Sequence, residues 1–520
     1  METEEIKKKQ KRVMIYVMII SLICVVGVSY AFFTAGMSSE TSTTVRADAG
    51  TMKITYSGGA NIDLAGIYPK DDVWATKTIT ITGNNTTDAE MYYKLTLVVD
   101  SNTFKTDDPL QYELVSTNTS TNGEIIPNIS KTDITGTSIE LGSGHFVKAN
   151  NAKHTYLLKI YYPKKATSQN ANQGAAFSAH VEITSAKAPT TLAKAILANN
   201  EVKTPITTPG ATVSTASEAL LASVEDDYGT SYYFRGAVKN NYVQFANKCW
   251  RIVRVGGDGS VKLILHNDNP TGAANPCDAA NNSASAAFAR YSGETYKSAF
   301  NTNYNDNAYV GFKYGTVGAS DYASAHVNTN KSTILTNLET WYNNNLKTYE
   351  SVIDDTVWCN DKTNVTDTSY NPWYWSNVTG LGYGTNVTIY GATQRLVSKN
   401  NSAGGTGPSL KCNGELSKIN SKVGLITADE LAFAGYAAGL QNSTTYLQEN
   451  ATDTYWWSLS PNGFRGGGGV ALVWSVGGSS GGFDGNYVGS TYGVRPSISL
   501  KSTTNVTGEG TSSSPFIINM

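Results

Sequence analysis

Residues 249–265 read CWRIVRVGGDGSVKLIL. Two runs rich in β-branched and other apolar residues, 250–255 and 261–265, flank the turn sequence Gly256-Gly-Asp-Gly259. Such runs, joined by a short Gly-rich turn, predict a β-hairpin. Two runs closer to the N-terminus have the same character and predict further strands: 232–235 and 242–245. The C-terminal half of the chain should therefore contain a β-sheet.

Two segments of the same half show helical spacing instead. From Ser332 to Ile353, large apolar side chains recur every three or four residues, and Ser332 is the expected N-cap. Thr427-Ala-Asp-Glu430 matches a capping box and predicts a second helix, which Gly439 can end. Helices among strands predict an α+β domain over residues 218–520.

The segment before this domain has a strand pattern throughout. Short runs in which apolar and polar residues alternate are separated by polar turn sequences such as Asn84-Asn85. This pattern predicts an all-β sandwich over residues 41–185. The expected strands are 52–56, 78–81, 93–99, 156–161 and 179–183.

Residues 186–217 are rich in Thr, Pro and Ala, with one short helical patch at 192–199. This composition predicts a connector between the two domains. The alternative is an ordered extension of either neighbour.

The N-terminus has the features of a targeting segment. A basic cluster (Lys7, Lys8, Lys9, Lys11 and Arg12) precedes an uncharged run from Val13 to Met37. Residues 1–40 are therefore expected to be an export signal or a transmembrane helix. A buried core helix is the alternative, but a run this long behind a basic leader rarely serves as one. Cleaved and retained forms both fit the pattern. Either places the rest of the chain outside the cytoplasm, anchored to the cell membrane or secreted.

Cysteine usage agrees with an oxidising compartment. Apart from Cys24 in the apolar run, the chain has Cys249, Cys277, Cys359 and Cys412, which allow three pairings. We favour Cys249 with Cys277 and Cys359 with Cys412, because nearest pairs close loops without crossing. Each loop would add about 3 to 4 kcal/mol of stability on the chain-entropy model. Free buried thiols are the alternative. The absence of a CxxC motif and the scattered His residues argue against zinc.

Composition narrows the function further. The chain has 520 residues, enough for about three domains, and only 16% of them are charged, with a net charge of -2. Nucleic-acid binding has no electrostatic support. Asn, Ser, Thr, Gly and 31 Tyr supply the polar surface instead. This composition favours an extracellular β-rich protein that works by adhesion or binding.

The first half resembles a known family. Ser29-Tyr-Ala-Phe-Phe-Thr-Ala35, Val45-Arg-Ala-Asp-Ala-Gly-Thr-Met-Lys-Ile54 and the stretches at 67–69 and 79–85 are similar to camelysin and biofilm-fibre (TasA-type) exported β-sandwich proteins. The resemblance covers residues 13–185. It implies an exported sandwich that can self-associate. Some relatives are called peptidases, but this chain has no HExxH motif, so that activity is not transferred.

The second half resembles an uncharacterised domain of bacterial surface proteins that is itself similar to C-type-lectin-like folds. The motifs that carry this resemblance are 227–236, 249–254, 424–430, Tyr455-Trp-Trp-Ser-Leu-Ser-Pro461 and Gly493-Val-Arg-Pro-Ser-Ile-Ser-Leu500. The contiguous calcium signatures of lectins are missing, so calcium-dependent sugar binding is not transferred. Formylglycine-generating enzymes share the distant fold, but their reactive cysteine pair has no counterpart here.

The segment 462–492 is the candidate recognition site. It is rich in Gly and carries aromatic and charged side chains, a mixture that paratopes use for contact. The candidate ligand-binding residues are Phe464, Arg465, Phe483, Asp484, Asn486 and Tyr487. The alternative is a Gly-rich loop whose aromatics belong to the core.

The sequence thus predicts an exported bacterial cell-surface protein, with a lectin-like recognition domain that binds a surface glycan or a protein ligand. No catalytic set, metal site or cofactor is expected, and the chain is not expected to be an enzyme. The alternative function is a structural matrix subunit that polymerises through the edges of its sandwich by strand addition.

Overall fold

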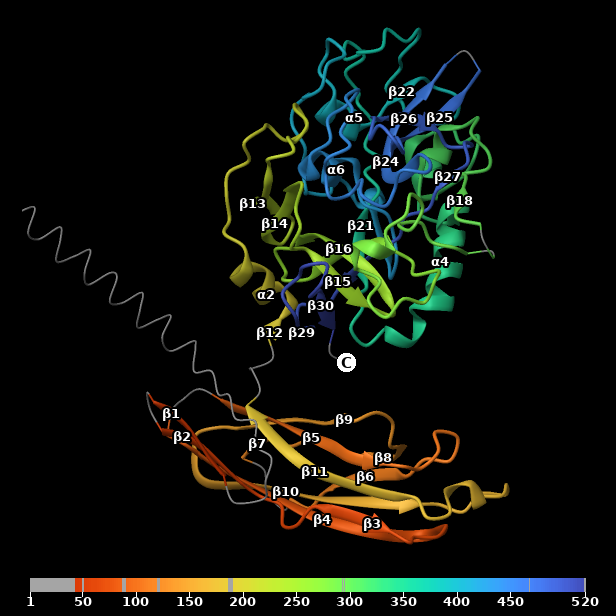
Figure 1. Cartoon of the computed structure of the whole chain (residues 1–520). Coiled ribbons are helices and arrows are strands. Elements are labelled where there is room, and N and C mark those ends of the chain that lie inside the picture. The colour runs from red at the N-terminus through yellow and green to blue at the C-terminus, as the bar shows by residue number, and fades with distance from the viewer. Residues whose placement is uncertain are drawn as a thin grey trace, which may run out of the picture. The chain divides into compact units, whose positions relative to one another are not determined.

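A computed structural model describes residues 43–48, 51–86, 90–118, 122–185, 190–291, 293, 295–466 and 468–518. It divides into two compact units, Met1–Ala188 and Pro189–Met520, both built mainly from β-strands (Figure 1). The predicted signal or transmembrane segment, residues 1–40, lies outside the described residues. None of the helices within the described ranges is both long and apolar enough to cross a bilayer.

The first unit has two sheets that form a β-sandwich, as expected from the alternating sequence (Figure 1). The described strands of one sheet follow the order β1 (Thr43–Asp48), β2 (Thr51–Ser57), β4 (Lys70–Asn85), β10 (Ala149–Tyr162), β6 (Gln111–Ser116) and β8 (Ile129–Asp133). Those of the other sheet follow the order β3 (Ile62–Ala65), β11 (Ala176–Ser185), β5 (Met91–Asn102), β9 (Ser138–Phe146) and β7 (Gly123–Glu124). Every strand predicted from the alternation lies inside one of these strands.

Strand β5 shows why the alternation decides this fold. Its buried and half-buried residues alternate from Met91 to Val99, and Tyr93, Leu95 and Leu97 are fully buried. The strand pairs antiparallel with β9 on one side and β11 on the other. A one-residue slip would turn these side chains away from the core, so burial fixes the register.

The described part of the predicted connector, from Thr190 onward, belongs to the second unit. Strand β12 (Thr190–Thr191) pairs with β29 (Asn505–Thr507). Helix α2 (Leu192–Asn199) confirms the predicted helical patch, and its Leu192 and Ile196 side chains are buried in the core of the second unit. Two apolar residues four positions apart thus hold this segment against the second unit.

The larger sheet of the second unit contains the predicted hairpin. Strands β16 (Lys248–Val255) and β17 (Val261–Asn267) pair antiparallel across Gly256–Gly259. In the described part of this sheet, β17 also pairs with β28 (Ser497–Leu500). The other strands follow the order β12, β29, β30 (Phe516–Ile518), β15 (Tyr242–Phe245), β16, β14 (Gly229–Gly236) and β13 (Ala219–Asp226).

A second sheet supports the candidate site. Its described strands follow the order β18 (Lys297–Ser298), β27 (Tyr492–Gly493), β24 (Trp456–Arg465), β25 (Val470–Val476) and β26 (Phe483–Tyr487), and β22 (Thr388–Ile389) pairs with β24. Two short ribbons pair β19 (Lys313–Tyr314) with β20 (Asn330–Lys331), and β21 (Thr356–Cys359) with β23 (Lys418–Ser421). Figure 1 shows β22, β25 and β26 at one end of the second unit.

Both predicted helices exist, with shorter bounds. Helix α4 (Thr333–Asn345) is capped by Ser332, as expected, but ends before Ile353, and a 3-10 turn, Lys347–Tyr349, follows it. Helix α6 (Ala428–Ala434) has the predicted capping box, but Gly435 ends it rather than Gly439. Gly435 adopts a φ of 126°, a conformation that glycine tolerates best. The other short helices of the described ranges are α3 (Tyr322–His326), α5 (Gly391–Leu396) and 3-10 turns at Asn170–Asn172, Ala279–Asn281, Asn307–Val310 and Glu415–Ser417.

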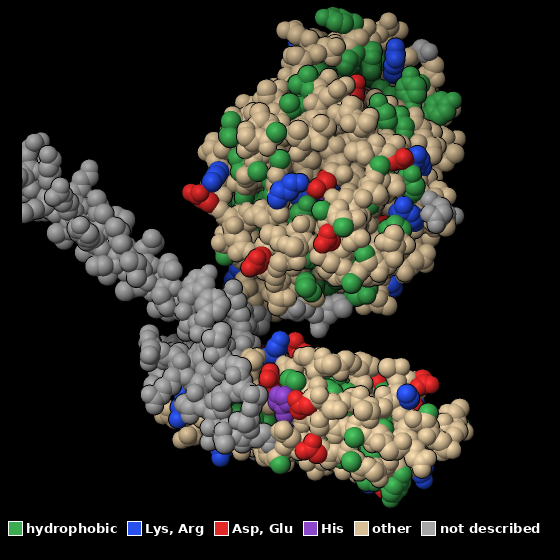
Figure 2. All heavy atoms as spheres, viewed as in Figure 1, with side chains coloured by type: hydrophobic (Ala, Val, Ile, Leu, Met, Phe, Trp, Pro, Cys, Tyr) green, Lys and Arg blue, Asp and Glu red, His purple; other side chains and the backbone are tan. Residues whose placement is uncertain are grey.

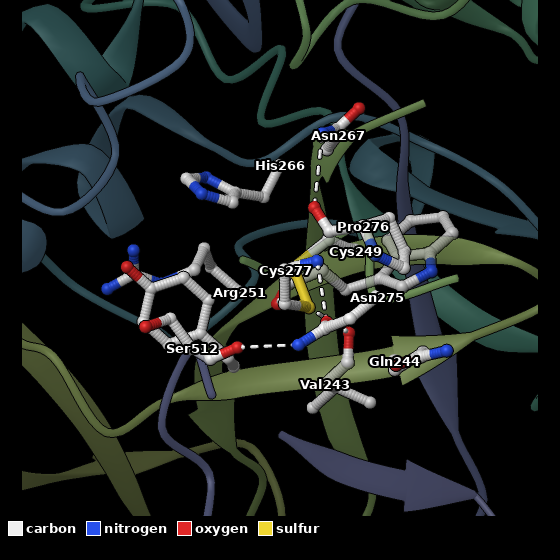
Figure 3. Close-up of a disulfide and its surroundings, with 12 residues drawn as sticks. Val243, Gln244, Cys249, Arg251, His266, Asn267, Asn275, Pro276, Cys277 and Ser512 are labelled. Carbon is white, nitrogen blue, oxygen red and sulfur yellow. Dashed lines mark hydrogen bonds between the residues drawn. A yellow bond between two sulfur atoms is a disulfide. The ribbon is translucent and has the colours of Figure 1, made fainter. Parts of the chain in front are cut away.

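Both favoured disulfide pairings are present, Cys249–Cys277 and Cys359–Cys412. The first ties β16 to the loop that follows β17 (Figure 3). Asn275 holds this loop in place: its Nδ2 donates a hydrogen bond to the Ser512 carbonyl at 3.0 Å, and its Oδ1 accepts one from the Cys277 N–H at 3.0 Å. The bridge thus connects the large sheet to this loop, and Asn275 connects the loop to the segment at Ser512.

Candidate functional site

Two of the six predicted ligand-binding residues belong to the core instead. Phe464 and Phe483 are completely buried, with exposed fractions of 0% and 1%. The Phe483 ring packs against Trp474, with 4.7 Å between the ring centroids, and against Tyr436. Both rings belong to the hydrophobic core of the second unit and neither lines the groove that the other predicted residues share, so these two positions are corrected to core residues.

The other four predicted residues line one surface groove of about 480 Å³. Arg465 comes from the end of β24, and Asp484, Asn486 and Tyr487 come from β26. Strand β25 lies between β24 and β26 and pairs with both. Residues that are 19 or more positions apart in the sequence therefore line one groove. The remaining lining residues are Trp373, Trp375, Asn462, Leu472 and Gly485.

A pair of tryptophans that sequence reasoning missed forms one wall of the groove. The rings of Trp373 and Trp375 stack with 4.7 Å between their centroids and an interplanar angle of 30°. Asn371 fixes this turn, since it accepts from the Trp375 N–H at 2.9 Å and donates to the Trp375 carbonyl at 2.8 Å. A Cβ at Gly463 would come within 2.7 Å of the Trp375 ring, so this glycine allows the ring to lie on β24. The alternating aromatic run Trp373-Tyr-Trp375 was the available sequence signal.

The floor of the groove contains an unpartnered amide. Asn462 is 1% exposed, and its Nδ2 finds no hydrogen-bond partner among the described residues. Its backbone carbonyl accepts from Tyr390 N–H at 3.2 Å and from Thr393 Oγ1 at 2.8 Å, which fixes its position on β24. A Cβ at Gly485 would lie 2.4 Å from the Asn462 carboxamide, so only glycine leaves room for it there. A buried donor without a partner costs about 1 to 3 kcal/mol, which a ligand can recover by accepting from it.

The rim carries one charge of each sign. Arg465 is exposed and forms no ion pair within the described ranges, while Asp484 accepts a hydrogen bond from the Gly485 N–H at 2.7 Å. Neighbouring protein limits the hydration of the Asp484 carboxylate and thereby raises its pKa. Tyr487 is 47% exposed. Charged and aromatic groups are therefore both accessible at this rim.

Asn486 differs from its neighbours because its side chain is already engaged. Its Nδ2 donates to Ser475 Oγ at 2.7 Å, and its Oδ1 accepts from the Tyr492 hydroxyl at 3.1 Å. It therefore stiffens the groove wall more than it offers free hydrogen-bonding groups.

Figure 2 shows hydrophobic side chains gathered on the visible surface at the end of the second unit that carries β22 and β25.

A second cavity of about 370 Å³ has a different chemistry, because the buried charged groups in its wall pair with one another. Glu430 Oε1 lies 2.7 Å from Lys262 Nζ and 3.0 Å from Arg254 Nε. Arg395 forms ion pairs of 2.7 Å with both Asp361 and Asp429. These buried groups already satisfy one another, so the wall of this cavity is a structural ion-pair network.

No metal-ligating group of three or more His, Cys, Asp or Glu side chains occurs in the described part of the chain. No protein-family model matches the sequence, and no curated protein matches it either. The function is therefore inferred from the residues of the chain and their arrangement.

Proposed function

We propose that this chain is an exported bacterial cell-surface protein whose second unit binds a ligand through the groove between Trp373, Trp375 and β26. One observation carries the proposal: the groove combines partly exposed aromatic surface with the Arg465 guanidinium and the Asn462 amide, for which the described residues supply no ion-pair or hydrogen-bond partner. Binding energy at interfaces concentrates on aromatic and Arg side chains of this kind. Adhesion to another surface is the activity that such a groove supports.

Export is supported by independent features. The basic cluster and uncharged run at the N-terminus fit a signal or membrane anchor, and disulfides persist mainly in oxidising compartments outside the cytoplasm. The membrane would hold the N-terminal helix, with both folded units outside. If the signal is cleaved, the protein is secreted.

The family resemblances are part of the same proposal. We propose that the first unit is a camelysin or TasA-type sandwich and that the second is a C-type-lectin-like α+β domain. The capping box at Thr427 and most of strand β16 lie within the motifs that carry the second resemblance.

A second candidate function is a matrix subunit that self-associates through its sandwich. Strand β8 is the last described strand on one side of its sheet, and all of its residues after Ile129 are exposed. Such an edge can accept another strand. However, Lys131 lies in the middle of β8, and an edge lysine disfavours strand addition. Adhesion through the groove is therefore the better-supported function.

The test is binding of the purified full chain to intact cells. Arg465→Ala removes an exposed side chain that forms no ion pair with the described part of the chain, so it should weaken binding by about fivefold or more and leave the thermal midpoint unchanged. Tyr228→Ala is the matched control, because Tyr228 is 61% exposed and lines the other cavity. Equal affinities for the wild type, Arg465→Ala and Tyr228→Ala would contradict the proposal. Groove-independent assembly into fibres would favour the matrix function.

A further inference from the structure

The chemistry of the groove also indicates what kind of ligand it takes. We infer that the groove binds an uncharged pyranose sugar, such as a residue of a neutral cell-surface glycan, an inference that rests on the proposed function. The aromatic wall, the polar floor and the balanced charge of the rim each support this assignment.

The aromatic wall fits the face of a sugar ring. Trp373 and Trp375 are both partly exposed and are held in position by Asn371 and the backbone at Gly463. The flat face of an indole carries negative charge density, which attracts the weakly positive C–H groups on one face of a pyranose. A rigid pair of stacked indoles offers such a surface at little cost in conformational entropy.

The polar groups of the groove require a ligand that both donates and accepts hydrogen bonds. Asn462 Nδ2 and the Arg465 guanidinium can only donate, whereas the ionised Asp484 carboxylate can only accept. A sugar hydroxyl does both, so neighbouring hydroxyls of one ring can satisfy groups of opposite character. A purely apolar ligand would leave the Asn462 amide buried without a partner.

The charge of the groove argues against strongly charged ligands. Arg465 is the single cation and Asp484 the single anion among its lining residues, and they do not form an ion pair with each other. An anionic ligand would gain Arg465 but would be repelled by Asp484, and a cationic ligand would meet the reverse. An uncharged ligand rich in hydroxyls meets neither penalty.

The Asn462→Ala variant separates a role in sugar binding from a role in stability. Because no described residue accepts a hydrogen bond from its Nδ2, Asn462→Ala should leave the thermal midpoint unchanged or raise it slightly. The same change should lower affinity for a neutral sugar about tenfold, because a hydrogen bond that is buried in the complex is lost. A side chain with a purely structural role would show the opposite pattern, with lower stability and unchanged affinity.

The experiment measures binding of the full chain and of its Trp375→Ala, Asn462→Ala and Tyr228→Ala variants. The probes are an array of neutral, sialylated and uronic-acid oligosaccharides, together with cells treated with periodate or with protease. The inference predicts binding to neutral oligosaccharides that falls at least tenfold in the first two variants only. Binding to cells should be lost after periodate treatment and should survive protease.

Two outcomes would overturn the inference and leave the proposed function intact. One is Trp375-dependent cell binding that survives periodate but not protease, which would make the ligand a protein. The other is Trp375-dependent binding to acidic glycans alone, which would make Arg465 a carboxylate receptor. The absence of any binding that depends on Trp375 or Arg465 would instead overturn the proposed function as well.

Discussion

Replacing Glu430 with Ala should destabilise the second unit by about 3 to 5 kcal/mol, because it leaves two cations in the protein interior without their shared counter-ion. The Glu430 side chain is 3% exposed, and its Oε1 contacts both Lys262 Nζ and Arg254 Nε. Its Oε2 accepts a hydrogen bond from the Thr427 N–H at 2.9 Å, so the substitution also removes the capping box of α6.

The lowered pKa of Glu430 implies a similar contribution to the free energy of unfolding. Burial alone would raise this pKa, but the charges of Lys262 and Arg254 outweigh burial and lower it from 4.5 to about 2. A shift of this size corresponds to about 3 kcal/mol. Because the folded pKa is the lower one, this stability is complete above pH 4.5 and is lost as the pH falls towards 2.

The assay is urea denaturation followed by tryptophan fluorescence, since every Trp except Trp74 lies in the second unit. Glu339→Ala is the control, because the Lys331–Glu339 pair is partly exposed and should contribute at most about 1 kcal/mol. The wild type should lose stability between pH 4.5 and 2 more steeply than Glu430→Ala. A loss below 1 kcal/mol in Glu430→Ala at pH 7 would refute the reasoning.

Three further changes test the core, the disulfides and a buried histidine. In chemical denaturation, Phe464→Ala should lower the free energy of unfolding by about 3 to 5 kcal/mol, because the ring is fully buried. Tyr487→Ala, at the exposed rim, should lower it by about 0.5 kcal/mol or less. Equal losses in the two variants would contradict the placement of these residues. Cys277→Ser should lower stability by about 3 to 4 kcal/mol, and mass spectrometry of unreduced wild-type peptides should show two bridges rather than four alkylatable thiols. Burial, assisted by the charge of Lys362, lowers the pKa of His326 to about 3, so the unfolded chain takes up a proton between pH 6.5 and 3 that the folded chain does not. Stability should therefore decrease on acidification across this window, by up to about 1.4 kcal/mol per pH unit for this histidine, and His326→Gln should flatten the slope; an identical slope would exclude this cause.

Local sequence patterns were sufficient for much of the fold. Alternation predicted the strands of the first unit because one face of each is buried, and Gly256–Gly259 predicted the β16–β17 hairpin. The local sequence does not show which side chains of the site segment are buried. Phe464 and Arg465 are neighbours on β24, yet Phe464 is fully buried and Arg465 is exposed. Phe483 and Asp484 are likewise a buried and an exposed neighbour on β26, and the burial of both Phe rings depends on distant elements that pack against these strands.

The missed parts of the site depend on long-range pairing. Trp373 and Trp375 are about 90 residues before Arg465 in the sequence. They pack against a cluster that contains Ile389 of β22, and β22 pairs with β24. No local pattern encodes that pairing. The same limit applies to residues 190–217, whose composition is typical of a connector although Leu192 and Ile196 pack into a core formed by distant strands.

The proposed binding site is tested most directly by hydrogen–deuterium exchange on the full chain, with and without neutral oligosaccharides released from cells to which it binds. Binding in the groove predicts slower exchange at residues 371–376, 462–465 and 484–487, with little change around Tyr228 or in the first unit. Protection confined to other segments, in a sample where binding is saturated, would contradict the assignment of the groove as the ligand site.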